Sequence, residues 1–223
     1  MNTSTVIITG ATRGLGEALT DALMRRTAHQ VISLSRRTTA QQEAYDKSRF
    51  SLIPVDFTQE DDYRHISRLN GLVRHPELVL ISNAAMLGPV GPAGSFTAEA
   101  IDRVLAVNFR AAVYLANYLL KNFASHRLTM LNISSGAAIR PISHWSLYCA
   151  TKAGMAMFFD VLQQEHPHAR FINFEPGVMD TAMQQQIRSS DFPLREKFIG
   201  YQEKGMLRQP AEVAEELVND YLL

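Results

Sequence analysis

The sequence has 223 residues, of which 46% are hydrophobic and 20% charged, which is ordinary for a globular protein with one domain. Its 22 basic side chains equal its 22 acidic ones, so no surplus of positive charge favours an extended surface for nucleic acid or an anionic membrane. A single cysteine excludes an internal disulfide and a cysteine-based zinc site, and no apolar run approaches the roughly 20 residues of a membrane helix.

No repeat, low-complexity tract or linker rich in serine and glycine divides the chain, so we expect residues 1–223 to form a single domain. The segment Met1–Thr5 lacks the basic stretch that opens a signal peptide, and it leads directly into an apolar run. Together with the low cysteine content, this predicts a reduced, cytosolic compartment.

Short apolar runs alternate along the chain with longer segments of helical period. The runs predict six strands, at residues 5–9, 31–34, 50–55, 78–81, 128–133 and 171–174. Helices are expected near residues 15–28, 60–74, 98–124, 146–165 and 210–221. Because strand and helix alternate, right-handed crossovers should produce a parallel sheet. We therefore expect a doubly wound α/β fold with helices on both faces, whose ligands bind beyond the carboxyl ends of the strands.

A glycine-rich stretch, Thr9–Gly16, lies between the first predicted strand and the first predicted helix. Its glycines, Gly10, Gly14 and Gly16, follow the spacing GxxxGxG. Glycine lets the backbone turn sharply and approach a pyrophosphate, while the amide groups at a helix start attract its charge. Ordinary tight turns also use glycine, but the position after the first strand favours a nucleotide site.

The second predicted strand leads into Ser35, Arg36 and Arg37. A cofactor with a free ribose 2′-hydroxyl usually meets an acidic residue about 20 positions beyond the glycines, and that count from Gly16 reaches Arg36, with no acid beside it. Two guanidinium groups and a hydroxyl suit a 2′-phosphate, to which Arg13 could add a further positive charge. The pattern favours NADP(H) over NAD(H); the alternative is that Arg36 and Arg37 are solvated loop residues.

The third and fourth predicted strands end in residues that suit the adenosine half of such a cofactor. Asp56 could accept a hydrogen bond from an adenine amino group, or it could cap the helix expected near Thr58, and both interpretations stay open. Asn83 and Ala84 follow the fourth strand, where small side chains let the backbone lie against a ribose.

Tyr148 and Lys152 stand one helical turn apart in the helix expected at residues 146–165, so their side chains point the same way. A nearby ammonium favours phenolate, and we expect Lys152 to lower the pKa of Tyr148 from about 10. Ser135 follows the fifth predicted strand, and Asn108 lies mid-helix among apolar neighbours, where a buried amide needs a partner. A YxxxK pair alone is common by chance, but its combination with the glycine loop, Ser135 and Asn108 is not.

With these motifs the sequence resembles the short-chain dehydrogenase/reductase superfamily, which has a Rossmann-like fold. The resemblance spans the chain through the TGxxxGxG loop, Asn83, Asn108, Ser135, the YxxxK pair and the segment Pro176–Thr181. Within the superfamily, residues 134–137, 145–150 and 176–185 look most like the sepiapterin reductase and benzil reductase branch.

The resemblance implies an NADPH-dependent oxidoreductase that reduces the carbonyl of a small ketone, a diketone or a pterin side chain to an alcohol. Two alternatives are a 3-oxoacyl or hydroxysteroid reductase and a non-catalytic nucleotide-binding sensor on the same fold. The sensor is disfavoured because Tyr148, Lys152 and Ser135 are all present. The resemblance also implies a homodimer, with a small molecule as substrate and neither nucleic acid nor a membrane as partner.

The same resemblance assigns roles to individual residues. Tyr148 would exchange a proton with the substrate oxygen, Ser135 would hydrogen-bond that oxygen, and Lys152 would hold the nicotinamide ribose and tune Tyr148. Asn108 would anchor a water that links Lys152 to solvent, while Thr181 and the backbone around Val178 would hold the carboxamide. The implied cofactor-binding residues are Gly10, Thr12, Arg13, Gly14, Leu15, Gly16, Ser35, Arg36, Arg37, Asp56, Asn83, Ala84, Tyr148, Lys152, Pro176, Gly177, Val178 and Thr181.

Three features depart from the pattern of the superfamily. Ala85 stands where a glycine is usual, which should cost little if its φ is negative. Glu175 precedes Pro176 where a small or apolar residue is usual, and it is either a solvated acid or a modifier of the pocket. The seventh strand that usually follows the last helix has no counterpart after residue 221, which questions pterin recognition and the sheet-edge subunit contact.

Residues 181–208 are glutamine-rich and lack a strand pattern, so we expect a substrate lid over the nicotinamide. An adaptable apolar pocket could be lined by Met179, Met183, Phe192, Phe198 and Met206, although the same residues could pack a helix onto the core. Trp145 either faces the substrate or is structural, and residues 86–92 could form the opposite wall. No metal site is expected, because His166 and His168 close a helix and no third ligand accompanies them or His144.

Overall fold

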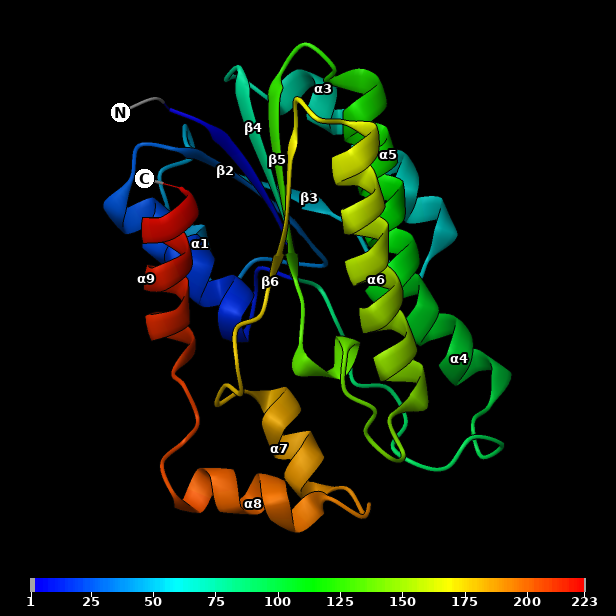
Figure 1. Cartoon of the computed structure of the whole chain (residues 1–223). Coiled ribbons are helices and arrows are strands. Elements are labelled where there is room, and N and C mark those ends of the chain that lie inside the picture. Colours follow the sequence, from blue (N-terminus) through cyan, green and yellow to red (C-terminus); the bar gives the residue numbers. More distant parts are fainter. Residues whose placement is uncertain (1–2, 223) are drawn as a thin grey trace.

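A six-stranded parallel sheet with the order β3-β2-β1-β4-β5-β6 forms the centre of the molecule (Figure 1). This computed structural model describes residues 3–222. The strands are β1 (Thr5–Thr9), β2 (Gln30–Ser35), β3 (Phe50–Pro54), β4 (Glu77–Ser82), β5 (Arg127–Ile133) and β6 (Arg170–Phe174). Each lies within one residue of its predicted bounds, and the predicted doubly wound fold is confirmed. Because the order reverses between β1 and β4, a crevice opens there beyond the carboxyl ends.

Successive residues of the strands supply two apolar layers, because side chains alternate across a sheet. Ile7 of β1 shares one buried cluster with Leu115 and Phe159, whereas Ile8 shares the other with Leu19 and Leu217. The first layer is covered by α5 and α6 and the second by α1 and α9, on opposite faces of the sheet (Figure 1). The helices are α1 (Gly14–Arg26), α2 (Ala40–Glu43), α3 (Leu69–Leu72), α4 (Ala98–Leu105), α5 (Ala111–Asn122), α6 (Ser146–Glu165), α7 (Ala182–Ser189), α8 (Arg195–Glu203) and α9 (Pro210–Tyr221).

The helix expected at residues 60–74 is for the most part a 3₁₀-helix, η1 (Glu60–Arg68), before the short α3. In a 3₁₀-helix, side chains three residues apart lie on one edge. Asp62 and His65 have this spacing, and both reach the end of β3. The Asp62 carboxylate accepts the N–H of Asp56 at 2.8 Å, and the His65 ring lies 2.9 Å from the carbonyl oxygen of Pro54. These two bonds account for the tighter winding.

The helix expected at residues 98–124 is interrupted by a π-helical turn, η2 (Ala106–Arg110), between α4 and α5. Asn108 lies in this turn and is 5% exposed. Its amide oxygen accepts the N–H of Met86 at 2.9 Å, and its amide nitrogen donates to the carbonyl oxygen of Met86 at 2.8 Å. The turn thus fixes the chain that leaves β4. π-Turns of this kind often mark functional sites.

The described chain adds no seventh strand after α9, so β6 is an edge of the sheet. His29 instead joins the two ends of the chain: its Nδ1 accepts the N–H of Ser4 at 3.0 Å, and its Nε2 lies 2.7 Å from the carbonyl oxygen of Leu222. Because Nδ1 accepts, Nε2 carries the proton and donates. None of the helices within residues 3–222 has the length and apolar character needed to cross a membrane.

Candidate active site

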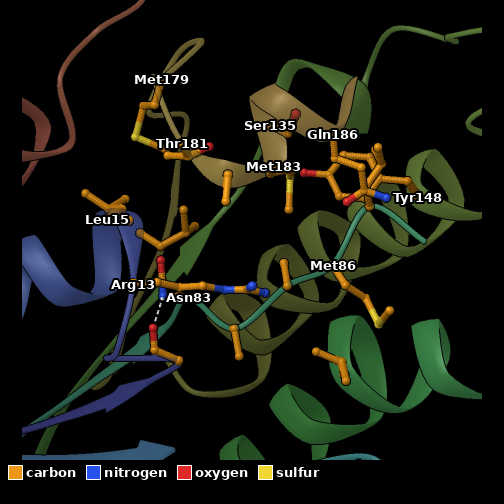
Figure 2. Close-up of a pocket in the computed structure, with 18 of the residues that line it drawn as sticks. Arg13, Leu15, Asn83, Met86, Ser135, Tyr148, Met179, Thr181, Met183 and Gln186 are labelled. Carbon is orange, nitrogen blue, oxygen red and sulfur yellow. Dashed lines mark hydrogen bonds between the residues drawn. The ribbon is translucent and has the colours of Figure 1, made fainter. Parts of the chain in front are cut away.

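The carboxyl ends of the strands open into a cleft of about 450 Å³, which contains most of the residues singled out in the sequence (Figure 2). Three predicted site residues lie outside its lining: Gly16 and Asn108 support it from behind, and Arg37 faces a neighbouring hollow. The predicted residues that line the cleft are Gly10, Thr12, Arg13, Gly14, Leu15, Ser35, Arg36, Asp56, Asn83, Ala84, Ser135, Tyr148, Lys152, Pro176, Gly177, Val178 and Thr181.

The glycine loop makes a turn that other residues could not follow. Gly10 and Gly14 have φ values of +67° and +54°, a region that favours glycine. A Cβ at Gly16 would lie 2.2 Å from the carbonyl oxygen of Gly10 and 2.5 Å from the amide nitrogen of Asn83, because α1 passes directly over the turn. That amide nitrogen donates to the carbonyl oxygens of Thr9 and Gly10 at 3.0 and 3.1 Å, and its side chain is seen below α1 in Figure 2. These contacts fix the shape of the turn, whose backbone a ligand can approach closely.

Two buried hydroxyls brace the glycine loop against its neighbouring strands. The Thr9 hydroxyl accepts the N–H groups of Asn83 and Ala84, both at 2.9 Å. The Ser35 hydroxyl accepts the N–H of Ala11 at 2.9 Å, and Ser35 is only 5% exposed. Ser35 therefore positions the loop, and because it accepts in this bond, its own hydrogen stays available to donate. The contact of its hydroxyl with a 2′-phosphate stays a prediction. Ala85 does not have a positive φ, so the methyl group in place of the usual glycine causes no backbone strain.

Lys152 connects α6 to the end of β5. Its ammonium group donates to the carbonyl oxygen of Ile133 at 2.7 Å and lies 5.8 Å from the centre of the Tyr148 ring. Ser135 follows Ile133 by two residues, and its hydroxyl is close enough to the Tyr148 phenol to favour a lower pKa of that phenol. The phenol, the ammonium and the strand-end hydroxyl thus line the same cleft, where Figure 2 shows Ser135 and Tyr148.

Burial has the largest effect on the pKa values of Tyr148 and Lys152. It raises the pKa of Tyr148 to about 12, against the opposing effect of the Ser135 hydroxyl, and it lowers the pKa of Lys152 to about 8. The expectation that Lys152 lowers the pKa of Tyr148 is therefore wrong for the free protein. Tyr148 and Lys152 are 7% and 6% exposed, and desolvation disfavours the charged form of each by more than their proximity favours it. The phenol is protonated at neutral pH.

Asn108 contacts both the catalytic helix and the chain after β4. Besides its two bonds to Met86, its amide nitrogen donates to the Thr151 hydroxyl at 3.2 Å, and that hydroxyl donates to the carbonyl oxygen of Tyr148 at 2.9 Å. The side chain thus serves as a brace, through Thr151, for the turn of α6 that carries Tyr148 and Lys152. The sequence predicted that this amide has a buried partner, but it did not predict that the partners are Met86 and Thr151.

Basic residues surround a second hollow at the other end of the cleft. This hollow, of about 410 Å³, is lined by Thr12, Arg13, Arg36, Arg37, Thr38 and Thr39. Arg36 also lines the main cleft, close to Asp56. Burial opposes ionisation of Asp56, but hydrogen bonds from Thr58 and the charges of Arg36 and Arg103 outweigh it and lower the pKa of Asp56. Asp56 accepts hydrogen bonds from the N–H and the hydroxyl of Thr58 at 3.0 and 2.8 Å, in a turn that precedes the helix. The helix itself begins after Gln59 with no side-chain cap, so the expectation that Asp56 caps it is wrong.

The predicted lid contains two helices, α7 and α8, rather than an irregular loop. Thr181 caps α7 by accepting the N–H of Gln184 at 3.4 Å. The helices close the far end of the cleft, which has an apolar lining. Met183, Ile187 and Phe198 of the lid and Leu87 and Trp145 from outside it form this lining. Phe192 lies behind this lining against Trp145, with ring centres 5.5 Å apart, and Met206 is 56% exposed outside it. Trp145 also meets the Tyr148 ring edge-on at 5.9 Å, so it is both structural and part of the lining.

Several lining residues were missed in the sequence. Gln184, Gln186 and Ile187 face the cleft from α7, and Arg103 reaches it from α4. A helical reading of residues 182–189 would have placed Met183, Gln186 and Ile187 on one face. Glu175 is partly exposed and lies 3.2 Å from the Arg140 guanidinium, which makes it a solvated acid beside the cleft. Within residues 3–222 no three side chains of the metal-binding types come together.

Comparisons with known proteins find similar sequences and a similar fold over most of the chain. A family model described as short chain dehydrogenase matches residues 4–191. The benzil reductase ((S)-benzoin forming) of Bacillus subtilis (strain 168) is 36% identical over 224 residues, covering 96% of this chain and 91% of that protein. The sepiapterin reductase of Mus musculus is 31% identical over 238 residues, covering 95% and 89%. Among solved structures, the KRED1-Pglu enzyme superposes with a TM-score of 0.88 at 27% identity, covering 97% of this chain and 94% of that one.

The close passage of α1 over the glycine turn predicts that Gly16→Ala lowers the free energy of unfolding by about 1–3 kcal/mol, because the added methyl group overlaps backbone. It should also weaken binding of a nicotinamide cofactor, since the turn must shift. Gly71→Ala is the matched control: it lies in α3 with no atom within 4 Å of the added methyl group, and it should be neutral or slightly stabilising. Urea unfolding measures the first effect, and fluorescence titration with the reduced cofactor measures the second. If Gly16→Ala binds the cofactor as tightly as the wild-type protein does, the assignment of the glycine turn as a nucleotide site is contradicted.

Proposed function

The chain belongs to the short-chain dehydrogenase/reductase family, an oxidoreductase family that uses nicotinamide cofactors, and on this premise we propose that it is an NADPH-dependent carbonyl reductase. Its proposed substrates are small ketones, diketones or pterin side chains, which it reduces to alcohols. The observation that carries the proposal is that Tyr148, Ser135 and Lys152 line one cleft, which begins at the glycine turn, with Lys152 fixed on Ile133 beside the Tyr148 ring. The likeness to a benzil reductase and a sepiapterin reductase supports carbonyl reduction.

The fit of a dinucleotide is supported by the shape of the cleft. The turn at Gly10, Gly14 and Gly16 lets the start of α1 pack closely on the loop, and it leads to the N-terminus of α1, whose amide groups attract the charge of a pyrophosphate. The residues that we propose to hold the cofactor are the predicted ones, including Ser35, whose hydroxyl accepts the N–H of Ala11 and keeps its own hydrogen to donate. When bound, a reduced nicotinamide supplies hydride to the carbonyl carbon.

The protein side of the reaction follows from the arrangement of three side chains. The Ser135 hydroxyl donates to the substrate oxygen and stabilises the negative charge that develops there. Tyr148 then transfers its phenolic proton to that oxygen; its raised pKa keeps the proton in place until negative charge forms. Lys152, fixed by Ile133, lies behind the ring, where its ammonium form stabilises the phenolate that remains. Asn108 and Thr151 keep this turn of α6 in position.

The preference for NADPH over NADH is supported by the second hollow. Arg13, Arg36 and Arg37 line it together, and no acidic side chain does. A 2′-phosphate placed there would accept charge-assisted hydrogen bonds from guanidinium groups, whereas a 2′-hydroxyl would leave three cations without a counter-charge.

We propose further that residues 1–223 act as one domain in the cytosol, with residues 181–208 as the substrate lid. The proposed homodimer would pair α5 and α6 with the same helices of a second copy. This is supported by large apolar side chains on these helices that are exposed in the single chain, namely Tyr114 at 41%, Met157 at 63% and Val161 at 41%.

Tyr148→Phe removes the proton donor but keeps the ring and its contacts. We expect kcat for benzil reduction to fall by about 10²–10⁴-fold, while the dissociation constant for NADPH changes little. Tyr118→Phe is the control, because its hydroxyl bonds Asn70 outside the cleft. Absorbance of NADPH follows turnover, and a Tyr148→Phe protein as active as wild type refutes the role of Tyr148.

Arg36→Ala removes one of the cations from the second hollow. We expect the dissociation constant for NADPH to rise about tenfold and that for NADH to stay the same, because only NADPH carries the 2′-phosphate. Arg64→Ala removes the same charge from an exposed site outside both hollows and serves as control. Fluorescence titration gives both constants; an equal loss for the two cofactors, or none, contradicts a 2′-phosphate contact.

A further inference from the structure

The substrate end of the cleft contains few side chains that can hydrogen-bond a ligand. Its polar side chains include Ser135 and Tyr148, which the proposed reaction uses, and two glutamines of α7. Ser134 and Thr181 also line the cleft, but Ser134 is buried and Thr181 caps α7. Gln184 is 3% exposed and its amide oxygen lies 3.5 Å from the Arg188 guanidinium. The Trp145 indole N–H is enclosed by protein atoms, so a ligand does not reach it. Gln186 remains as the accessible amide.

Gln186 joins the two walls of this end of the cleft. It lies on the lid, and its amide nitrogen donates to the carbonyl oxygen of Gly88, in the loop that forms the opposite wall, at 3.3 Å. Figure 2 shows Gln186 and Met183 on α7, with Tyr148 on α6. A primary amide has two N–H groups. One of them is fixed on Gly88, which sets the orientation of the amide and leaves the other for a ligand.

We propose that Gln186 is a specificity-determining residue that donates a hydrogen bond to the second oxygen of a vicinal dicarbonyl substrate. This inference rests on the carbonyl reduction proposed above. Gln186 lines the cleft from α7, while Ser135 and Tyr148 line it from the end of β5 and from α6. A carbonyl next to the reacting one would offer its oxygen to Gln186 while the first oxygen stays on Ser135 and Tyr148. Ser135 and Tyr148 hold the first oxygen, and Gln186 holds the second.

The physical basis is the cost of an unmatched polar group. Gln186 is exposed in the free protein. A ligand that covers its amide without offering an acceptor would leave the second N–H desolvated with no partner, and it is therefore disfavoured against a ligand that has one. For a vicinal diketone the amide gains an acceptor, while the apolar residues Met183, Ile187 and Phe198 contact the hydrocarbon part. The second oxygen does not react, so its hydrogen bond contributes to binding and is expressed mainly in KM.

Benzil and deoxybenzoin test this inference, since they differ by one carbonyl oxygen and share the aryl ketone that is reduced. We expect Gln186→Leu to lower the ratio of kcat/KM for benzil to that for deoxybenzoin by about tenfold, through a higher KM for benzil. Gln185→Leu is the matched control: it lies on the same helix, is exposed and does not line the cleft, so both substrates should behave as with wild type.

Two results overturn the inference. An equal loss for both ketones in Gln186→Leu means that the residue only latches the lid to Gly88. Wild-type values of kcat/KM for both ketones mean that the amide does not contact the second oxygen. Failure of the proposed function is distinguishable from both, because wild-type protein would then reduce neither ketone with NADPH.

Discussion

The hydrogen bond from Lys152 to the carbonyl oxygen of Ile133 fixes the geometry on which the site depends. It ties α6 to the last residue of β5, a strand in the interior of the sheet. Tyr148 lies one helical turn before Lys152, and Ser135 follows Ile133 by two residues. One bond between two rigid elements therefore sets the relative position of the phenol and the hydroxyl, which is more precise than a placement on mobile loops.

Desolvation is the second consequence of this arrangement. Lys152 and Tyr148 are both more than nine-tenths buried, and burial moves the two pKa values in the directions that favour the neutral forms, down to about 8 for Lys152 and up to about 12 for Tyr148. A protonated phenol beside a titratable amine suits proton donation to an oxygen that acquires negative charge. The same enclosure strengthens every electrostatic interaction that forms during the reaction.

The structural features that the sequence predicted are those with local causes. The six strands follow from continuous apolar runs, and the glycine turn and the Tyr148–Lys152 pair follow from spacing on one turn or one helix. What it did not predict depends on distant contacts. The π-turn at Asn108 exists because Met86 lies opposite, Ser35 braces Ala11 because two strands meet, and the pKa of Tyr148 is set by the residues that cover it. The orientation of Gln186 across the cleft likewise required the fold.

The titration of Lys152 tests the central claim most directly, because its pKa reports both its burial and its attachment to β5. Nuclear magnetic resonance of ¹⁵N-labelled lysine side chains in the free protein, with the Lys152 signal identified by its absence in Lys152→Met, gives the midpoint. The account predicts a midpoint near pH 8. A midpoint near 10.4, as in an unperturbed lysine, contradicts it, because the ammonium group would then lie in solvent rather than against Ile133.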